Sequence, residues 1–265
     1  MKKLLFLLVV CSLLSTGCHH RVKGDAFEIN TVTVEDSVQF PPEAMEEWMY
    51  DDKAYYLTVV DEPVTNNEDL RDNIIAWISS FLSENYDGDS QDVTAMVNYE
   101  KDEFLDTVNG SPQSSLQHFI TLDEDNDRYV TYLSENYLYT GGIHGTISKT
   151  GATFSKKTGE QFGYQMFVNL DGVSDIIRNA VKQQYFEPLL EGTDAVFEET
   201  LFSDAAESFP MPVTEPWIQN DSVFFIYESY EIAPYAFGMP ECGLPFLSLK
   251  DHLTEAGKAF FQIKQ

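Results

Sequence analysis

Basic residues are scarce in this sequence of 265 residues, which has 16 lysines and arginines against 44 aspartates and glutamates. The formal net charge of −28 argues against nucleic-acid binding, because contact with a phosphate backbone depends on positive charge. The same charge disfavours adsorption to anionic lipid headgroups. It favours encounter with a cationic partner, although solubility alone would explain an acidic surface equally well.

Cysteine is also scarce, with Cys11, Cys18 and Cys242 as its three positions. Cys11 and Cys18 lie in the N-terminal segment discussed below, which leaves Cys242 without a disulfide partner in the mature chain. A core can form without disulfides, since 43% of the residues are hydrophobic and 14% are aromatic. We therefore expect Cys242 to be a buried and inert thiol.

Several patterns that mark catalytic and metal sites are absent. No serine stands in a nucleophile-elbow pattern, and no glycine-rich phosphate loop occurs. The segment 123–127 alternates oxygen ligands as a calcium loop does, but Arg128 and Ser134 stand where that loop has glycine and glutamate. We expect a solvated turn there, and no metal or cofactor. The histidines lack the spacing of a zinc site: His19, His20, His118, His144 and His252.

The N-terminus has the features of a signal peptide. Residues 1–3 carry two lysines, residues 4–14 are apolar except for one serine, and small residues at 15–17 precede Cys18. The apolar run is shorter than the roughly 20 residues of a permanent membrane helix, and no later run approaches that length. Residues 14–18 resemble the bacterial lipobox, in which the cysteine is acylated, with palmitate for example, and cleavage occurs just before it. The alternative is an ordinary signal peptide with an incidental cysteine.

This reading divides the chain into four parts. We expect a signal peptide at 1–17, a lipidated tether at 18–26, an N-terminal α+β subdomain at 27–140 and a C-terminal one at 141–265, with the two subdomains separate or joined in one compact unit. The lipid on Cys18 would be the only contact with the membrane. It would hold the protein outside the cytoplasm in the bacterial cell envelope, at the outer membrane or facing the periplasm.

Hydrophobic periodicity predicts the secondary structure of the folded part. Helices are expected at about 70–81, 93–105, 173–185 and 249–260, the last capped by Ser248 and Asp251. Strands mixed irregularly with helices predict an α+β fold, with largely antiparallel sheets and about four helices packed on them. The strands are expected at 27–40 (with a break or bulge), 54–60, 116–122, 128–140, 145–155, 223–227 and from 159 onward.

The first of two unusual segments is 139–145, with the sequence Tyr-Thr-Gly-Gly-Ile-His-Gly. Glycine permits a positive φ angle or a close backbone approach, so Gly141, Gly142 and Gly145 indicate a specially shaped loop. Either this loop presents Tyr139 and His144 to a ligand, or it is a structural bulge whose histidine is hydrogen-bonded internally.

The second unusual segment is 230–238, with the sequence Tyr-Glu-Ile-Ala-Pro-Tyr-Ala-Phe-Gly. Pro234 and Gly238 constrain this aromatic loop. Tyr230 and Tyr235 offer large contact areas with polar tips, as binding surfaces do. The alternative is a corner that packs its tyrosines on the core.

The same segments resemble motifs of a domain family of unknown function. Residues 139–145 resemble its Tyr-x-Gly-Gly-Ala-His element, with Ile143 in place of the alanine, and residues 158–167 resemble the Thr-Gly-Lys strand that follows. Residues 230–238 are similar to its Tyr-Glu-Ile-Ala-Pro-Tyr signature. The family includes the extracytoplasmic sensor domain of RsiV-type anti-sigma factors, which respond to lysozyme, and domains that accompany PdaC-type peptidoglycan deacetylases. The resemblance spans about residues 27 to 250.

This resemblance implies a non-catalytic binding or sensing module of the cell envelope, for a cationic protein such as lysozyme or for peptidoglycan. Tyr139, His144, Tyr230 and Tyr235 are the candidate ligand contacts. Neither a sigma-binding segment nor a deacetylase domain is recognisable, so we expect neither role. The alternatives are an envelope hydrolase acting on cell-wall glycan, with His144 in a concave pocket, and a structural or assembly role.

Overall fold

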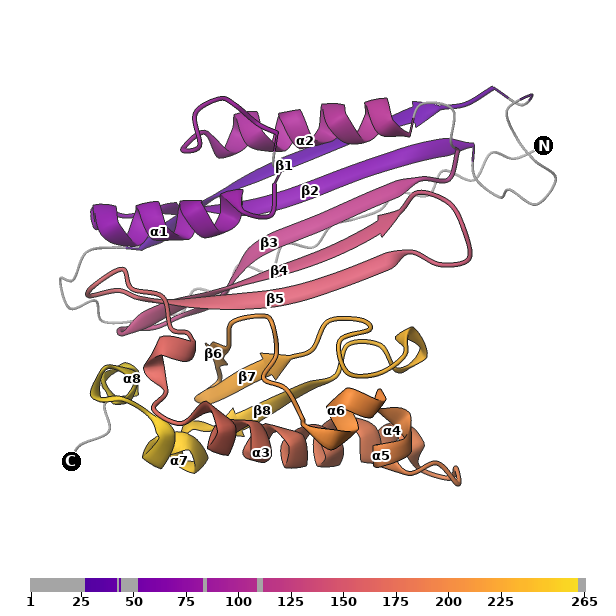
Figure 1. Cartoon of the computed structure of the whole chain (residues 1–265). Helices are drawn as coiled ribbons and strands as arrows, with labels where there is room; N and C mark the ends of the chain where they lie inside the picture. The colour runs from indigo at the N-terminus through magenta and orange to yellow at the C-terminus, as the bar shows by residue number, and fades with distance from the viewer. Residues whose placement is uncertain (1–26, 42, 44–51, 83–84, 109–111, 262–265) are drawn as a thin grey trace, which may run out of the picture.

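A computed structural model describes residues 27–41, 43, 52–82, 85–108 and 112–261 (Figure 1). The expected signal peptide at 1–17, the tether at 18–26 and the lipid site Cys18 lie outside these residues. Among the helices that the structure describes, none combines the length and the apolar character needed to cross a membrane.

Five strands form the first sheet, in the order β1-β2-β3-β4-β5. The neighbours are antiparallel except for β2 and β3, which are parallel. A parallel pair needs a crossover connection, and two helices between β2 and β3 provide it (Figure 1). The elements are β1 (Glu28–Gln39), β2 (Lys53–Val64), α1 (Glu68–Ser79), α2 (Val93–Thr107), β3 (Ser115–Asp125), β4 (Tyr129–Tyr139) and β5 (Thr146–Ser155).

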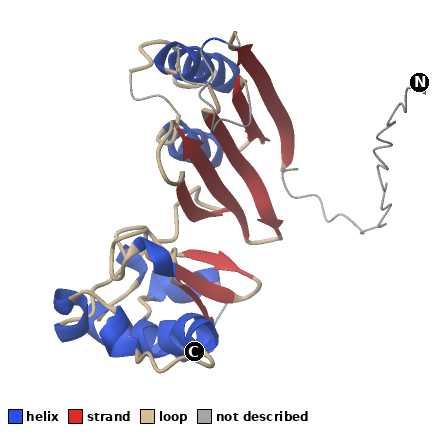
Figure 2. Ribbon diagram, turned by 90° about the vertical axis from the view of Figure 1, so that its right-hand side faces the viewer, coloured by secondary structure: helices blue, strands red, loops and turns tan. Residues whose placement is uncertain are grey.

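The two faces of this sheet differ in burial because α1 and α2 lie on only one of them (Figure 2). Alternation along β3 buries His118 and Ile120 on the helix-covered face and leaves Phe119 between them partly exposed on the other, here called the open face. On the covered face, Tyr56, Ile74 and Ile120 are fully buried.

The C-terminal unit has a three-stranded antiparallel sheet in the order β6-β7-β8, with α3 beside it (Figure 1). The amphipathic face of α3 buries Val173, Ile177 and Val181 against the strand residue Phe225. The elements are 3-10 turns at Tyr164–Met166, Tyr235–Phe237 and Lys250–His252, a π-helical turn at Lys182–Phe186, α3 (Leu170–Val181), α4 (Glu187–Leu190), α5 (Phe197–Thr200), α6 (Ser203–Glu207), β6 (Trp217–Gln219), β7 (Ser222–Ile226), β8 (Glu241–Pro245), α7 (Phe246–Leu249) and α8 (Glu255–Phe260).

The two units meet where β6 packs on the open face of β4 and β5. The Thr153 hydroxyl oxygen accepts the backbone N–H of Ile218 at 2.8 Å, and the Thr131 hydroxyl donates to the Ile218 carbonyl at 2.7 Å. Trp217 is fully buried and occupies the space where a side chain at Gly151 would begin. We call this set of interactions the docking contact. It covers one end of the open face of β4 and β5 and leaves the other end exposed.

The α+β fold with largely antiparallel sheets is confirmed. The expected break in β1 is wrong, since the strand pairs with β2 in unbroken register from Glu28 to Gln39. The apolar pattern looked broken because Ile29 and Val32 lie on opposite faces of the strand. Ile29 points to the open face, where it is 40% exposed, while Val32 is buried on the other face.

Two other predicted elements also differ. The strand expected from residue 159 is a single bridge between Phe154 and Gln161. The C-terminal helix is interrupted, and its last segment α8 is capped by the side chain of Thr254, which accepts the N–H of Gly257, rather than by Ser248 and Asp251. The boundary expected at 140/141 separates β4 from β5, two neighbouring strands of one sheet.

Gly151→Ala is expected to destabilise the protein. The added Cβ would lie 2.5 Å from ring atoms of the buried Trp217. Overpacking of this kind costs about 1–3 kcal/mol, measurable as a lower free energy of unfolding in urea. Ser148→Ala on the same strand, at an exposed position, is the control and should change stability by less than about 0.5 kcal/mol. Equal stability of the two variants would contradict the docking contact.

Cys242 is expected to resist alkylation in the folded protein. The thiol is unpaired and 2% exposed, and burial, helped by the charge of Glu241, raises its pKa to about 12. A raised pKa keeps the thiol neutral at all lower pH values, and the thiolate is the reactive form. Iodoacetamide at pH 8 should leave the Cys242 peptide unmodified until urea unfolds the chain. Mass spectrometry showing equal labelling with and without urea would contradict this.

Candidate functional site

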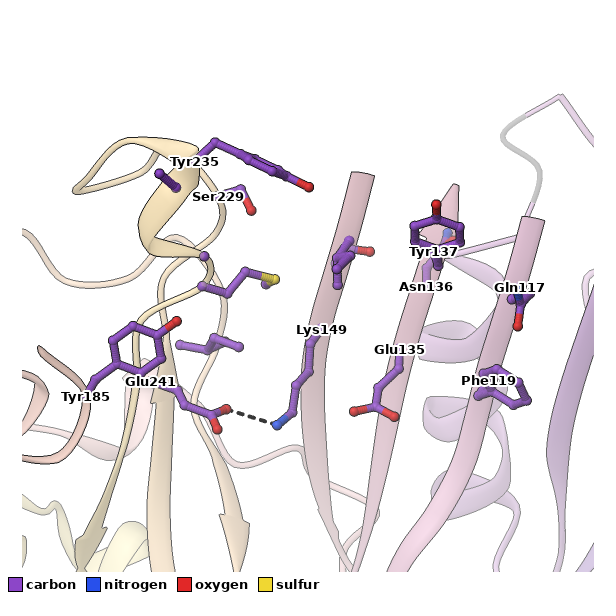
Figure 3. A pocket seen from close by; sticks show the side chains of 16 residues that line it. Gln117, Phe119, Glu135, Asn136, Tyr137, Lys149, Tyr185, Ser229, Tyr235 and Glu241 are labelled. Atoms are coloured by element: carbon purple, nitrogen blue, oxygen red, sulfur yellow. Dashed lines mark hydrogen bonds and ion pairs between the residues drawn. The ribbon is translucent and has the colours of Figure 1, made fainter. Parts of the chain in front are cut away.

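A groove of about 690 Å³ lies between the exposed part of the open face and the C-terminal unit. Its sheet side is formed by β3, β4 and β5, and its other side by β7, β8 and the loop that contains the 3-10 turn at Tyr235–Phe237. Figure 3 shows the labelled side chains of the two sides facing each other across it. Four aromatic side chains line it: Phe119, Tyr137, Tyr185 and Tyr235.

Charged groups in the groove are mainly acidic. The ammonium of Lys149 on β5 pairs with Oε2 of Glu241 on β8 at 2.9 Å, which links the two sides (Figure 3). Glu135 on β4 lies beside Lys149 and is exposed, and its carboxylate makes no hydrogen bond or ion pair with any described residue. Burial raises the pKa of the nearby Asp123 carboxyl, and the negative charges of Glu124 and Glu135 contribute. A cation in the groove would therefore find Glu135 available.

The two loops singled out in the sequence meet beside this groove. The imidazole of His144 stacks on the ring of Tyr235, with centroids 3.9 Å apart and planes 15° apart. The Tyr235 hydroxyl donates to the Gly145 carbonyl at 2.7 Å. Tyr230 lies next to them, with its ring centroid 5.6 Å from that of Tyr235. The structure thus brings His144, Tyr230 and Tyr235 together from positions about ninety residues apart.

Glycine is required at positions 141, 142 and 145 of the first loop, for reasons that differ between positions. Gly141 and Gly142 have φ angles of 106° and 99°, in the region that favours glycine. A Cβ on Gly145 would lie 2.4 Å from the ring of Tyr137. Tyr139 does not reach the groove, because its hydroxyl donates back to the Gly142 carbonyl at 3.0 Å and closes its own loop. Its contacts are those of a loop-shaping residue.

The second loop is held in a strained shape. Gly238 has a φ angle of 69°, and Pro234 precedes the 3-10 turn that carries Tyr235. Tyr230 has a φ angle of 70° although it is not glycine, and it is 58% exposed. A bulky residue in this region costs free energy and persists only where the surroundings fix it. Such strain at an exposed aromatic residue is typical of a presented contact surface.

His144 does not lie in a concave catalytic pocket. Its Nδ1 is 3.0 Å from the Gly145 carbonyl, and a carbonyl only accepts, so Nδ1 carries the proton. One ring face is occupied by Tyr235, and no serine or cysteine hydroxyl or thiol is bonded to it in the described part of the chain. This arrangement fits a packing role at the rim of the groove.

The sequence did not single out Phe119, Glu135, Tyr137, Lys149 or Glu241. Phe119 and Tyr137 could have been noticed in the sequence. Each is an aromatic residue at a position where the alternation of its strand predicts a polar, outward-facing side chain. Glu135 and Glu241 gave none, since nothing separates them from the other acidic residues in the sequence. The groove exists only because the C-terminal unit stands opposite these strands.

The oxygens of the acidic segment 123–127 are used within the structure. Oδ1 of Asn126 accepts the N–H groups of Arg128 and Tyr129, and thus forms the turn between β3 and β4. Glu124 accepts the Tyr129 hydroxyl at 3.0 Å and the N–H of Asn220 in the C-terminal unit at 3.0 Å. Within the described ranges, no three His, Cys, Asp or Glu side chains gather in a set that could hold a metal ion.

Comparison with known proteins finds two kinds of similarity, one to a family model and one to the folds of solved structures. Residues 168–246 match the family model of DUF3298, described as a protein of unknown function. No curated protein matches the chain.

Two crystal structures are similar. One is of a DUF3298 family member from Bacteroides fragilis NCTC 9343, with a TM-score of 0.67 and 14% identity, covering 91% of this chain and 98% of that one. The other is of a DUF3298 family protein from Pseudomonas aeruginosa PAO1, with a TM-score of 0.57 and 19% identity, covering 86% and 95%. At such identities the likeness concerns the fold alone.

Tyr235→Phe is expected to loosen the loop at 139–145. The variant keeps the ring that stacks on His144 but loses the hydroxyl that donates to Gly145. One such hydrogen bond contributes about 1 kcal/mol, so hydrogen–deuterium exchange of the loop amides should become several-fold faster. Tyr230→Phe is the matched control, since the Tyr230 hydroxyl bonds to no described residue. Similar exchange in both variants would contradict the role of the hydroxyl.

Proposed function

We propose that this chain is a binding module of the bacterial cell envelope that captures a cationic protein segment in the groove, with a lysozyme-like protein as the specific candidate. One observation carries this proposal. The groove combines four aromatic rings with a carboxylate, that of Glu135, which has no partner among the described residues. Binding requires such complementary groups, whereas turnover would also require a reacting group within the groove.

The chemistry of the groove favours a lysine or arginine side chain. Aromatic faces attract cations, and the aliphatic stem of lysine or arginine packs on apolar surface while its charged end reaches a polar group. Phe119 lies opposite Glu135 on the neighbouring strand β3, and Tyr137 lies two residues along β4 from Glu135. An inserted cationic side chain would contact these rings and pair with the carboxylate.

The charge of the whole protein supports the same ligand class. A net charge of −28 creates a field that speeds the approach of a cationic protein and repels acidic ones. Such steering weakens as salt is added, because the screening length falls to about 8 Å at physiological ionic strength. Salt-sensitive binding is therefore a signature of the proposal.

The envelope location rests on the N-terminal sequence and on the family resemblance. A lipid on Cys18 would hold the module at the membrane surface, where secreted cationic proteins arrive. The resemblance to the sensor domain of RsiV-type anti-sigma factors supports a lysozyme-like ligand. The resemblance to domains that accompany PdaC-type deacetylases supports peptidoglycan as the other ligand. The acidic groove favours the cationic protein of these two.

The test is calorimetric titration of residues 19–265 into lysozyme at low and at physiological salt. We expect a micromolar or lower Kd that rises with salt. Glu135→Gln removes the free carboxylate and keeps its size, and should raise Kd about tenfold, since a hydrogen bond to a charged group contributes about 1.5–3 kcal/mol. Glu199→Gln, at an exposed position on α5, changes the net charge equally and should leave Kd nearly unchanged.

Equal effects of the two variants would show that only net charge matters, and the groove would then not be the site. No salt-sensitive binding at micromolar concentration, together with retention of the protein on insoluble peptidoglycan, would replace the cationic protein with the glycan as ligand.

A further inference from the structure

Three polar side chains form a hydrogen-bonded line on the covered face of the first sheet, and none of the three lines the groove. Nε2 of His118 on β3 lies 3.1 Å from the Ser134 hydroxyl on β4, and Nδ1 of His118 lies 3.4 Å from Oε1 of Glu100 on α2. His118 is 1% exposed and Ser134 4% exposed. A hydroxyl, an imidazole and a carboxylate in this order are the arrangement that activates a serine nucleophile.

The hydrogen-bond partners of His118 determine which ring nitrogen carries the proton, and they select the tautomer that a general base requires. A carboxylate only accepts hydrogen bonds, so in the neutral ring Nδ1 carries the proton and donates it to Glu100. Nε2 then has a free electron pair and accepts the proton of the Ser134 hydroxyl. The reverse order, with Nε2 protonated, would leave Nδ1 and Glu100 as two facing acceptors.

Glu100 is itself held in place. Its Oε2 lies 2.6 Å from the Tyr56 hydroxyl and 3.0 Å from the Thr58 hydroxyl, both on β2. Burial and the charge of Glu100 raise the pKa of Tyr56, so that hydroxyl keeps its proton and donates it. Glu100 therefore cannot turn away from His118 without breaking two hydrogen bonds in the interior.

The hydroxyl end of this line borders a cavity. A space of about 440 Å³ is lined by Ser134 and His118, by Trp77 and Phe81, and by Asn136 two residues along β4. Oδ1 of Asn136 is buried and has no partner among the described residues. Polar groups that only support a core are enclosed and satisfied. Ser134 and His118 are themselves nearly fully buried, but both also border this space, which is large enough for a small acyl group.

We propose that Ser134 is the nucleophile of a second, hydrolytic site, with His118 as its base and Glu100 as the residue that positions His118. The substrate class is a small carboxylic ester. Glu215 and Glu228 of the C-terminal unit also line the cavity, and its one lysine, Lys149, is already paired with Glu241. The two carboxylates would repel an anionic ester, so the alcohol portion of the substrate is neutral or cationic. This activity is additional to the groove's binding function and does not depend on it.

The reaction balances with water as the only co-reactant. The Ser134 oxygen forms a bond to the ester carbonyl carbon as its proton passes to Nε2 of His118. The bond from that carbon to the alcohol oxygen then breaks, and the alcohol leaves with the proton from Nε2. Water gives a proton to Nε2 as its oxygen bonds to the acyl carbon. The bond from that carbon to the Ser134 oxygen then breaks, Nε2 returns the proton to this oxygen, and the carboxylic acid is released. The Asn136 amide can donate to the carbonyl oxygen while it is negative.

The test uses residues 19–265 with a fluorophosphonate probe and with p-nitrophenyl acetate. We expect one phosphonate per chain, mapped to Ser134 by mass spectrometry, and hydrolysis of the ester above the buffer rate. Ser134→Ala should abolish labelling and reduce hydrolysis at least tenfold. The control is Ser203→Ala, which removes an exposed hydroxyl on α6 that does not line the cavity, and should keep both. No label on Ser134, or equal hydrolysis by wild type and Ser134→Ala, would overturn the proposal.

Glu100→Gln separates positioning from stability. The amide keeps the size of the carboxylate but does not hold the imidazolium that forms during the reaction, so kcat should fall at least tenfold with little change in KM. A structural role of Glu100 predicts a lower Tm and an unchanged kcat in the folded fraction, and that result would count against the proposal. Neither result bears on lysozyme binding, which is measured at the groove.

Discussion

The docking contact between Ile218 and the threonine pair Thr131 and Thr153 determines which surfaces of this protein stay exposed. The two hydroxyls satisfy the N–H and the carbonyl of Ile218 in the interior, where an unpaired backbone group would cost about 1–3 kcal/mol. Trp217 then packs on Gly151, the position in β5 where only a residue without a side chain leaves room. The C-terminal unit is thereby fixed against one end of β4 and β5, and it stands opposite the other end without covering it.

The groove follows from this partial covering. Phe119 and Tyr137 would be ordinary exposed residues of a sheet if the loop with Tyr235 did not face them, and they would be buried if β6 extended further. The Lys149–Glu241 pair links the two sides at 2.9 Å and neutralises one acid of the groove, which leaves Glu135 to determine the charge that a ligand meets. The stack of His144 on Tyr235 adds a second link at the rim. A preformed groove with both sides anchored loses little conformational entropy on binding.

Much of the fold could be predicted from local pattern, because burial alternates where a strand has one covered face and repeats every three to four residues where a helix packs. The helices α1 and α3 and the long strands β3 and β4 were all readable in this way. The break expected in β1 was wrong because Ile29 lies on the open face, and the C-terminal helix was interrupted where local periodicity could not show it. The loops at 139–145 and 230–238 were recognised from their unusual residues. Their contact, and the acids opposite them, depend on pairing across about ninety residues, which no local pattern encodes.

Neighbouring residues of β4 serve the two proposed sites because side chains alternate along a strand. Glu135 lines the groove on the open face and Ser134 lines the cavity beneath α1 on the covered face, while Asn136, Ser148 and Lys149 line both. The sheet backbone separates these faces, so a ligand in the groove has no direct contact with the Ser134 hydroxyl. Any influence of one site on the other would pass through the shared side chains or through a shift of β4 itself. The ladders with β3 and β5 hold β4 on both sides along most of its length, and a strand in the interior of a sheet resists such a shift. Coupling between the sites should therefore run through the three shared side chains rather than through β4. Glu135 and Ser134 each line only one of the two sites, so a substitution at either can be interpreted without reference to the other site.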